Sequence, residues 1–188
     1  MNVTTLRLAA LAALAAAVAG LAACSTPNQG DARIAATAQL TASASVAQPN
    51  PQLPVRGTLE FSQLGDTVRV MGVISGLKPN APHAFHVHEK GDCSAPDFIS
   101  AGGHFNPTNQ PHGAADSAHH HLGDMPQLMA DASGTARVSF SSKSLTLTGP
   151  NSIVGRSIIV HRDPDDVNAQ PTGNAGPRLA CGVIRAEN

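Results

Sequence analysis

The 188-residue sequence contains no tryptophan and no tyrosine, and it has only five phenylalanines. Its hydrophobic core must therefore be built mainly from Val, Ile, Leu and Ala, and such a domain benefits from staples such as a disulfide or a bound metal ion. Charged residues make up only 13% of the chain, and the formal net charge is −1. This balance gives no indication of a nucleic-acid-binding surface.

The first 23 residues have the features of an export signal. Arg7 supplies a positive charge, and residues 8–19 form an apolar run of about a dozen residues, which is too short for a permanent membrane-spanning helix. The following Leu21-Ala22-Ala23-Cys24 resembles the lipobox of bacterial lipoproteins, which implies cleavage before Cys24 and acylation of its thiol. An ordinary signal peptide that is cut after Ala17-Val18-Ala19 is the alternative.

Residues 25–50 are rich in Ser, Thr, Ala, Gln, Asn and Pro, which is typical of a flexible tether. Alternation at Ala36, Ala38 and Leu40 also allows a first strand within Ile34–Ser43, and the sequence leaves both interpretations open. The expected organisation is a signal peptide (1–23), a lipidated N-terminus with a tether and this first strand as an option (24–50), and one folded domain (51–188).

From Val55 onward, the pattern is that of β-strands. Apolar and polar residues alternate in Thr58–Phe61, in Thr67–Val70 and in Thr135–Phe140. Alternation with one apolar face is typical of half-buried antiparallel strands, and turn residues such as Gly, Pro and Asn separate these segments. No amphipathic helix is evident. The sequence therefore predicts an all-β sandwich or barrel.

Two histidines that are separated by a single residue, His86 and His88, lie in a predicted strand, Phe85-His86-Val87-His88-Glu89. Residues two apart on a strand share a face, so both imidazoles project the same way and can hold one ion. Imidazole is a ligand for copper, zinc, iron and nickel. Taken alone, this pair is also compatible with two solvated histidines on an edge strand.

The number of histidines argues against that second interpretation. Eight of the nine histidines lie within residues 83–121, and His161 is the ninth. Zinc favours four-coordinate sites made of His, Cys or carboxylate, and copper accepts several imidazoles. Six of these histidines together with Asp124 suffice for two metal sites if one imidazole serves both ions.

In order, identity and spacing, these residues resemble a bacterial copper/zinc superoxide dismutase over about residues 55–186. The matching segments are Phe85–Glu89, Gly91–Cys93, Ala101–Pro107, His112–Gly113, His121–Asp124, Val160–His161 and Thr172–Ile184. The resemblance implies a flattened eight-stranded Greek-key barrel with long metal-binding and disulfide loops. It also implies an enzyme that converts superoxide to dioxygen and hydrogen peroxide.

The resemblance implies one copper ion and one zinc ion per chain. The implied copper ligands are His86, His88, His104 and His161. The implied zinc ligands are His104, His112, His121 and Asp124, so that His104 bridges the two ions and takes part in catalysis. Copper would cycle between Cu(II) and Cu(I), whereas zinc has no redox states and would be structural. His119 and His120 are expected to be solvated, and His83 to be structural.

The resemblance also implies roles for two residues that are not metal ligands. Arg178 is expected to be catalytic, because a guanidinium near copper can attract and dock a small anion. Asp165 is expected to link the copper ligand His86 to the zinc ligand His112, with Asp166 as its competitor.

The loop between Asp166 and Thr172 departs from the family pattern. It is shorter than in many eukaryotic relatives and contains no charged residue, which leaves the source of long-range guidance open. Arg162 is a candidate for a minor role beside Arg178.

The resemblance further implies a disulfide between Cys93 and Cys181. Cys24 is then left over, and lipidation accounts for this odd cysteine. By resemblance to known bacterial lipoproteins, Ser25 rather than Asp after Cys24 implies a periplasmic protein that is anchored to the outer membrane of a Gram-negative host. The sequence is compatible with both a monomer and a homodimer. The alternative functions are a non-enzymatic periplasmic copper/zinc-binding lipoprotein and a redox-inactive interaction module, but the full ligand set and Arg178 favour the enzyme.

Overall fold

The computed structural model describes residues 35–187, and the expected signal peptide and Cys24 lie outside this part. The described chain is all-β, as predicted, and it contains no α-helix. Its only helical element is the short 3-10 helix η1 (Ile99–Ala101). The strands are β1 (Ala35–Ala42), β2 (Arg56–Leu64), β3 (Thr67–Ser75), β4 (Pro82–His83), β5 (Phe85–His88), β6 (Leu128–Met129), β7 (Ala136–Ser142), β8 (Ser157–His161) and β9 (Arg178–Ala186).

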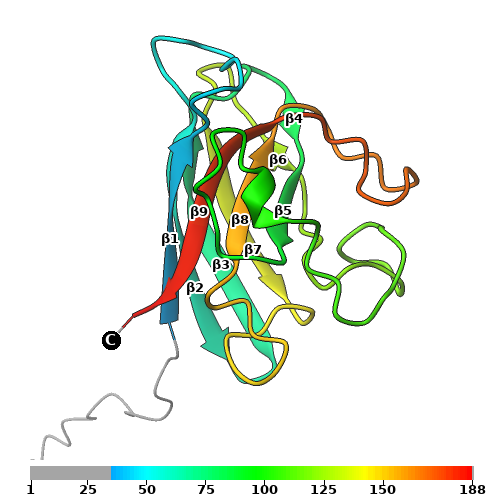
Figure 1. The fold of residues 1–188 in the computed structure, drawn as a ribbon. Helices are drawn as coiled ribbons and strands as arrows, with labels where there is room; N and C mark the ends of the chain where they lie inside the picture. The colour runs from blue at the N-terminus through cyan, green and yellow to red at the C-terminus, as the bar shows by residue number, and fades with distance from the viewer. Residues whose placement is uncertain (1–34, 188) are drawn as a thin grey trace, which may run out of the picture. The chain divides into compact units, whose positions relative to one another are not determined.

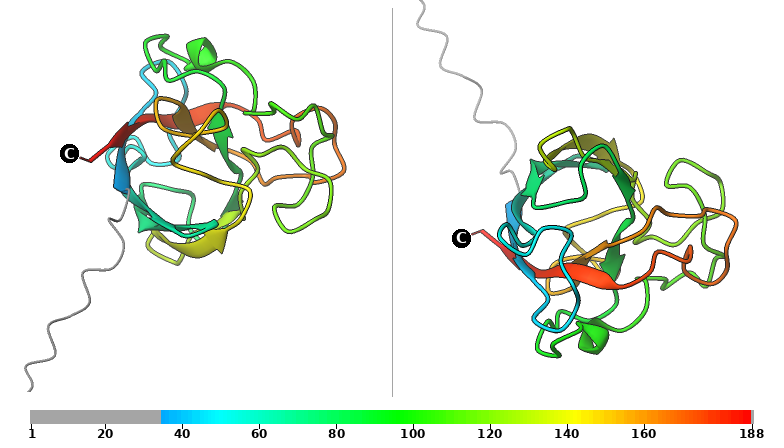
Figure 2. Two further views of the ribbon diagram at one scale, coloured as in Figure 1. Left: turned by 90° about the horizontal axis from the view of Figure 1, so that it is seen from below. Right: turned by 90° about the horizontal axis from the view of Figure 1, so that it is seen from above.

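Seven of these strands form one antiparallel sheet with the order β5-β8-β9-β1-β2-β3-β7. The sheet curls into a barrel, which is clearest when it is viewed along the strands (Figures 1 and 2). Neighbours such as β9 and β1 are far apart in sequence, as expected for Greek-key connections. The short strands β4 and β6 pair separately from the large sheet.

Strand β1 confirms the first strand that the sequence allowed within Ile34–Ser43. It pairs with both β2 and β9, and Ala38 lies opposite Leu59 on one side and Ile184 on the other. Ala36, Ala38 and Leu40 are buried, as their alternation suggested. The sheet therefore begins before the expected domain boundary at residue 51.

The core is aliphatic, as the composition requires. Its fully buried members include Leu59, Val68, Ile74, Ile158 and Ile184. Phenylalanine contributes Phe61, Phe85 and Phe105 to the same cluster. A smaller cluster places Phe98 and Ala101 against Ile159 and Cys181, which packs the loop after β5 onto β8 and β9.

The long connection from β5 to β6 has no strand of its own, but backbone hydrogen bonds hold it along β5. The amide of Phe105 donates to the carbonyl of Val87, and the amide of Val87 donates to the carbonyl of Gly123, both at 2.9 Å. Cys93 and Cys181 form a disulfide that ties the first half of this connection to β9. A disulfide that closes a loop of 88 residues contributes about 4–5 kcal/mol in the chain-entropy model.

Among residues 35–187, no helix is long and apolar enough to cross a membrane.

Candidate metal centre

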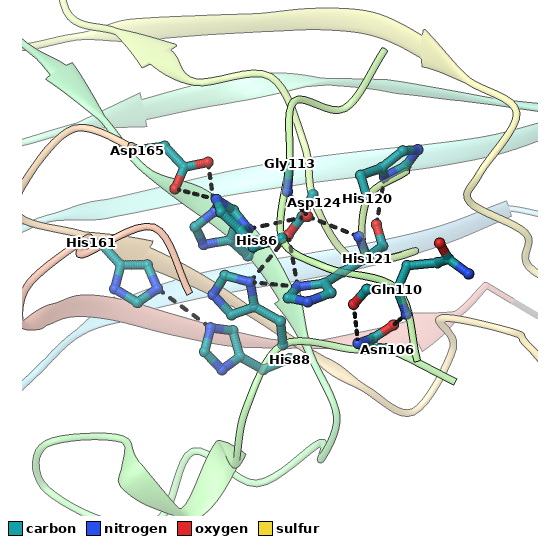
Figure 3. Close-up of polar contacts among 12 residues, drawn as sticks. His86, His88, Asn106, Gln110, Gly113, His120, His121, Asp124, His161 and Asp165 are labelled. Atoms are coloured by element: carbon teal, nitrogen blue, oxygen red, sulfur yellow. Dashed lines mark hydrogen bonds and ion pairs between the residues drawn. The ribbon is translucent and has the colours of Figure 1, made fainter. Parts of the chain in front are cut away.

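The pairing of β5 with β8 brings the first histidines together. His86 lies opposite Ile159, and a register shift after Val160 brings His161 to the end of β8. His88 Nε2 lies 3.3 Å from His161 Nε2 (Figure 3). His104 reaches the same place from the following loop, through an isolated β-bridge to His88.

These residues form two buried sets of potential ligands that share members. In the first set, one ring nitrogen from each of His86, His88, His104 and His161 lies within 4.8 Å of all the others. In the second set, the same holds for His86, His104, His112 and Asp124. His121 is not a member of that second set by this criterion, although its Nδ1 lies 3.3 Å from both Asp124 Oδ1 and His104 Nδ1.

His104 lies between the two sets. Its Nδ1 is 3.1 Å from Asp124 Oδ1, whereas its buried Nε2 has no hydrogen-bond partner within residues 35–187. The two ring nitrogens of His104 therefore have different surroundings: Nδ1 contacts Asp124, and Nε2 is available to bind an ion.

Asp165 lies where it contacts two of the histidines at once. Its Oδ2 is 3.1 Å from His86 Nε2, and its Oδ1 is 3.2 Å from His112 Nε2. The competing Asp166 is exposed and accepts a hydrogen bond from the amide of Asn168, within its own turn. Because Asp165 occupies His86 Nε2, only Nδ1 of His86 is left for a metal.

The donor atoms fit metal ions. His88 Nδ1 lies 3.0 Å from the carbonyl of Gly102, and His161 Nδ1 lies 3.2 Å from the carbonyl of Gly176. Each Nδ1 must donate a proton to its carbonyl, so the two Nε2 atoms face each other with lone pairs at 3.3 Å. Nitrogens that bind one ion tetrahedrally at about 2.0–2.1 Å stand about 3.3 Å apart, which matches.

Two buried ring nitrogens, His86 Nδ1 and His104 Nε2, lack a hydrogen-bond partner among the described residues. His112 Nδ1 instead lies 3.1 Å from Asp124 Oδ2. A buried polar atom without a partner costs free energy, and a bound cation would remove that cost. The arrangement therefore fits one ion in each set.

Burial keeps three imidazoles of the first set neutral, those of His88, His104 and His161. It lowers the pKa of His104 to about 4 and the pKa of His161 to about 3, and it holds the pKa of His88 well below its usual value. A metal ligand must be deprotonated, so these side chains are ready to bind an ion at neutral pH.

Asp124 contributes a negative charge to the second set. Burial opposes ionisation of Asp124, but hydrogen bonds with His104, His112 and His121 outweigh it and hold the pKa of Asp124 below its usual range. In His112, burial disfavours the protonated imidazole and by itself would lower the pKa. The carboxylates of Asp124 and Asp165 outweigh that effect and raise the pKa of His112 to about 9. The site thus attracts positive charge.

Arg178 lies beside the first set. It helps to line a cavity of about 170 Å³ together with His88, His104 and His161. Its guanidinium donates to the carbonyls of Phe98 and Gly102, both at 2.7 Å. Since both carbonyls belong to the disulfide-linked connection, that segment fixes where the guanidinium lies.

The other histidines have different surroundings. His83 is buried, and its Nε2 accepts a hydrogen bond from the amide of Lys78, so its Nδ1 donates to the carbonyl of His161. This geometry agrees with the expected structural role of His83. His119 is exposed. The expectation of a solvated His120 is wrong, because its Nε2 contacts Ser144 Oγ at 3.1 Å and the residue is half-buried.

Arg156 contacts neighbours of potential ligands, Gln170 contacts the potential ligand His112, and no sequence pattern indicates either contact. The guanidinium of Arg156 lies 3.6 Å above the ring of Phe105, and it donates to the carbonyl of Glu89 at 2.7 Å. Gln170 bonds the backbone of His112. Both contacts depend on loop paths rather than on a local motif.

Comparison with known proteins gives a consistent result. A family model for copper/zinc superoxide dismutase matches residues 55–184. An extracellular copper/zinc superoxide dismutase of Brugia pahangi is 43% identical over 139 residues, which cover 69% of each chain. A copper/zinc superoxide dismutase of Paramecium bursaria Chlorella virus 1 is 45% identical over 137 residues, which cover 70% of this chain and 73% of the viral one.

A solved structure also matches. The crystal structure of the clock protein EA4 superposes with a TM-score of 0.72 at 34% identity, covering 85% of this chain and 99% of the other. With a family model that spans most of the described domain and relatives above 40% identity, this chain belongs to the copper/zinc superoxide dismutase family.

Proposed function

We propose that the superoxide dismutase activity of this chain rests on a copper site and a zinc site that share His104. The reaction consumes two superoxide anions and two protons and yields one dioxygen and one hydrogen peroxide. The observation that carries the assignment is the position of His104, with Nδ1 beside Asp124 and Nε2 unpartnered on the opposite side of the ring.

We assign copper to the first set. Its ligands are His86, His88, His104 and His161. In this set, His88 and His161 each have Nδ1 bonded to a backbone carbonyl, which orients Nε2 toward the ion. Such outer contacts fix the tautomer and the ring orientation of a metal ligand.

We assign zinc to the site around Asp124. Its ligands are His104, His112, His121 and Asp124. His86 also lies near this group, but its single unpartnered nitrogen can serve only one ion. Since copper uses that nitrogen, the contact of His121 with Asp124 and with His104 makes it the fourth zinc ligand.

The residues around the cavity supply the rest of the chemistry. When bound, copper supplies the one-electron chemistry by alternating between Cu(II) and Cu(I). Arg178 binds and orients the anionic substrate, because two of its five N–H groups are bonded to carbonyls and the other three have no partner in the described part of the chain. His104 also lines this cavity, and its Nε2 can hold a proton.

Replacing Asp124 with alanine tests the assignment of zinc. We expect the zinc affinity to fall by more than about 100-fold, because Asp124 contacts three imidazoles and also accepts hydrogen bonds from the amides of Gly113 and His121. Copper affinity should change much less. Metal content after dialysis against a graded chelator measures both.

The exposed Asp166→Ala provides the matched control and should retain zinc. Wild-type protein that holds no zinc, or an Asp124→Ala protein that holds it as tightly as the wild type, would contradict the assignment. A metal store would need neither a shared imidazole nor Arg178 beside it, so the storage alternative is not favoured.

We further propose that the chain is an exported lipoprotein of the periplasm, anchored to the outer membrane through Cys24. The disulfide is consistent with an oxidising compartment, and the relative from Brugia pahangi is named as extracellular. Pairing of Cys93 with Cys181 leaves Cys24 as the odd cysteine, which lipidation would explain.

Replacing Cys24 with alanine should move the protein from the membrane fraction to the soluble fraction. The activity per copper should be unchanged, because the metal site lies in the folded domain. Fractionation followed by mass spectrometry of the mature N-terminus measures both the location and the lipid. Wild-type protein that is soluble without detergent would instead favour the ordinary signal peptide.

A further inference from the structure

We propose that Gln170 is a positioning residue for zinc, which it serves by holding the backbone of His112. This inference rests on the assignment of His112 to zinc. Gln170 lies in the short uncharged loop between Asp166 and Thr172. That loop has no charged residue that could guide superoxide, so the role proposed for Gln170 is not electrostatic guidance.

The contact is a reciprocal pair of hydrogen bonds. The amide N–H of His112 donates to Gln170 Oε1 at 2.9 Å, and Gln170 Nε2 donates to the carbonyl of His112 at 2.9 Å. A primary amide matched to both polar groups of one residue fixes the position and the orientation of that peptide. The imidazole of His112 is thereby set relative to the rest of the site.

The turn that carries Gln170 is closed on itself. The amide of Asp166 donates to the carbonyl of Gly173 at 2.9 Å, and the amide of Gly173 donates to the carbonyl of Ala169 at 2.8 Å. In the described chain, the two bonds of Gln170 are the hydrogen bonds that join residues 166–174 to the loop bearing His112.

Gly173 completes the seat for His112. A Cβ at this position would lie 2.7 Å from His112 Nε2 and would collide with Asp165 Oδ1, and the backbone has φ +73°, which favours glycine. The turn thus approaches the imidazole at Gly173 and holds the backbone at Gln170. These contacts position His112 from two sides.

The same turn continues into the cavity beside the proposed copper site. Thr172, Asn174 and Gly176 line that cavity together with Arg178. Gln170 therefore connects a zinc ligand with the segment that lines the proposed space for superoxide.

Gln170→Met tests the inference, because methionine has a similar volume and no charge but can make neither hydrogen bond. We expect the dissociation constant for Zn²⁺ to rise about tenfold, within the range typical of residues that orient metal ligands. Competition with a chromophoric chelator measures it on the full mature chain. The absorption spectrum of Co²⁺ bound in place of zinc should also change.

Asn168→Ala in the same turn is the matched control, and Gln170→Ala is a second variant that also removes both bonds. If Gln170→Met binds one Zn²⁺ as tightly as the wild type and Asn168→Ala do, and if its Co²⁺ spectrum equals theirs, the role of Gln170 is refuted. If His112→Ala binds Zn²⁺ as tightly as the wild type, the assignment of His112 to zinc fails instead.

Discussion

His161→Ala is expected to abolish the dismutation of superoxide while leaving zinc bound. His161 contributes its Nε2 to the proposed copper set, and its Nδ1 is committed to the carbonyl of Gly176. Alanine removes one of four imidazoles and leaves His88 Nε2 without its partner across the ion. His161 is not among the residues that surround Asp124, so the zinc ligands should be undisturbed.

Superoxide decay and metal content, measured on the same preparation, decide this prediction. The matched control is His119→Ala, since His119 is exposed and belongs to neither set, and it should behave as the wild type. Turnover in His161→Ala protein that lacks copper would show that the first set is not the site of electron transfer. Loss of zinc together with copper would show that the two sites do not separate as proposed.

The strand pattern and the histidine spacing account for most of what could be predicted. Alternation of apolar and polar residues predicted β2, β3 and β7, because a strand with one buried face has an apolar residue at every second position. His86 and His88 could be placed together because a strand puts alternate residues on one face. The grouping of His104 and Asp124 with them came from resemblance, since no local rule joins a loop to a strand.

The remaining features depend on the path of the chain rather than on any local pattern. In β1, the small side chains of Ala36 and Ala38 give weak alternation within an Ala- and Ser-rich segment, so its composition also fits a tether. His120 looked solvated beside its neighbour His119, but the loop carries it to Ser144. The contact of Gln170 with His112 joins residues 58 positions apart and involves only an amide and a peptide group.

Arg178→Glu should reduce the second-order rate constant for superoxide more than any other change of a residue that is not a metal ligand. Residues 24–188 contain 11 basic and 13 acidic residues, so attraction of an anion must be local. Clefts lined by one sign of charge raise association rates by roughly 10–1,000-fold, and this gain falls with ionic strength. Arg178 lines the cavity, whereas Arg162 is exposed and paired with Asp163 at 2.8 Å.

The size of the effect should follow the charge. We expect Arg178→Ile to lower the rate constant about tenfold at low salt and to flatten its salt dependence, and we expect Arg178→Glu to lower it further. Arg178→Lys keeps the charge but cannot bond both carbonyls as the guanidinium fork does, so it should retain part of the rate. It therefore separates the attraction of the anion from the anchoring of the loop.

Rates over a salt series, measured with copper and zinc content on each variant, test this prediction. The carbonyl of Gly102 faces both Arg178 and His88, so metal analysis is needed to show that His88 still binds copper. Arg162→Ile is the matched control and should lose little activity, because Asp163 already compensates the charge of Arg162. If fully metallated Arg178→Glu protein reacts as fast as the wild type at low salt, the positive potential at the cavity has another origin and Arg178 does not guide the substrate.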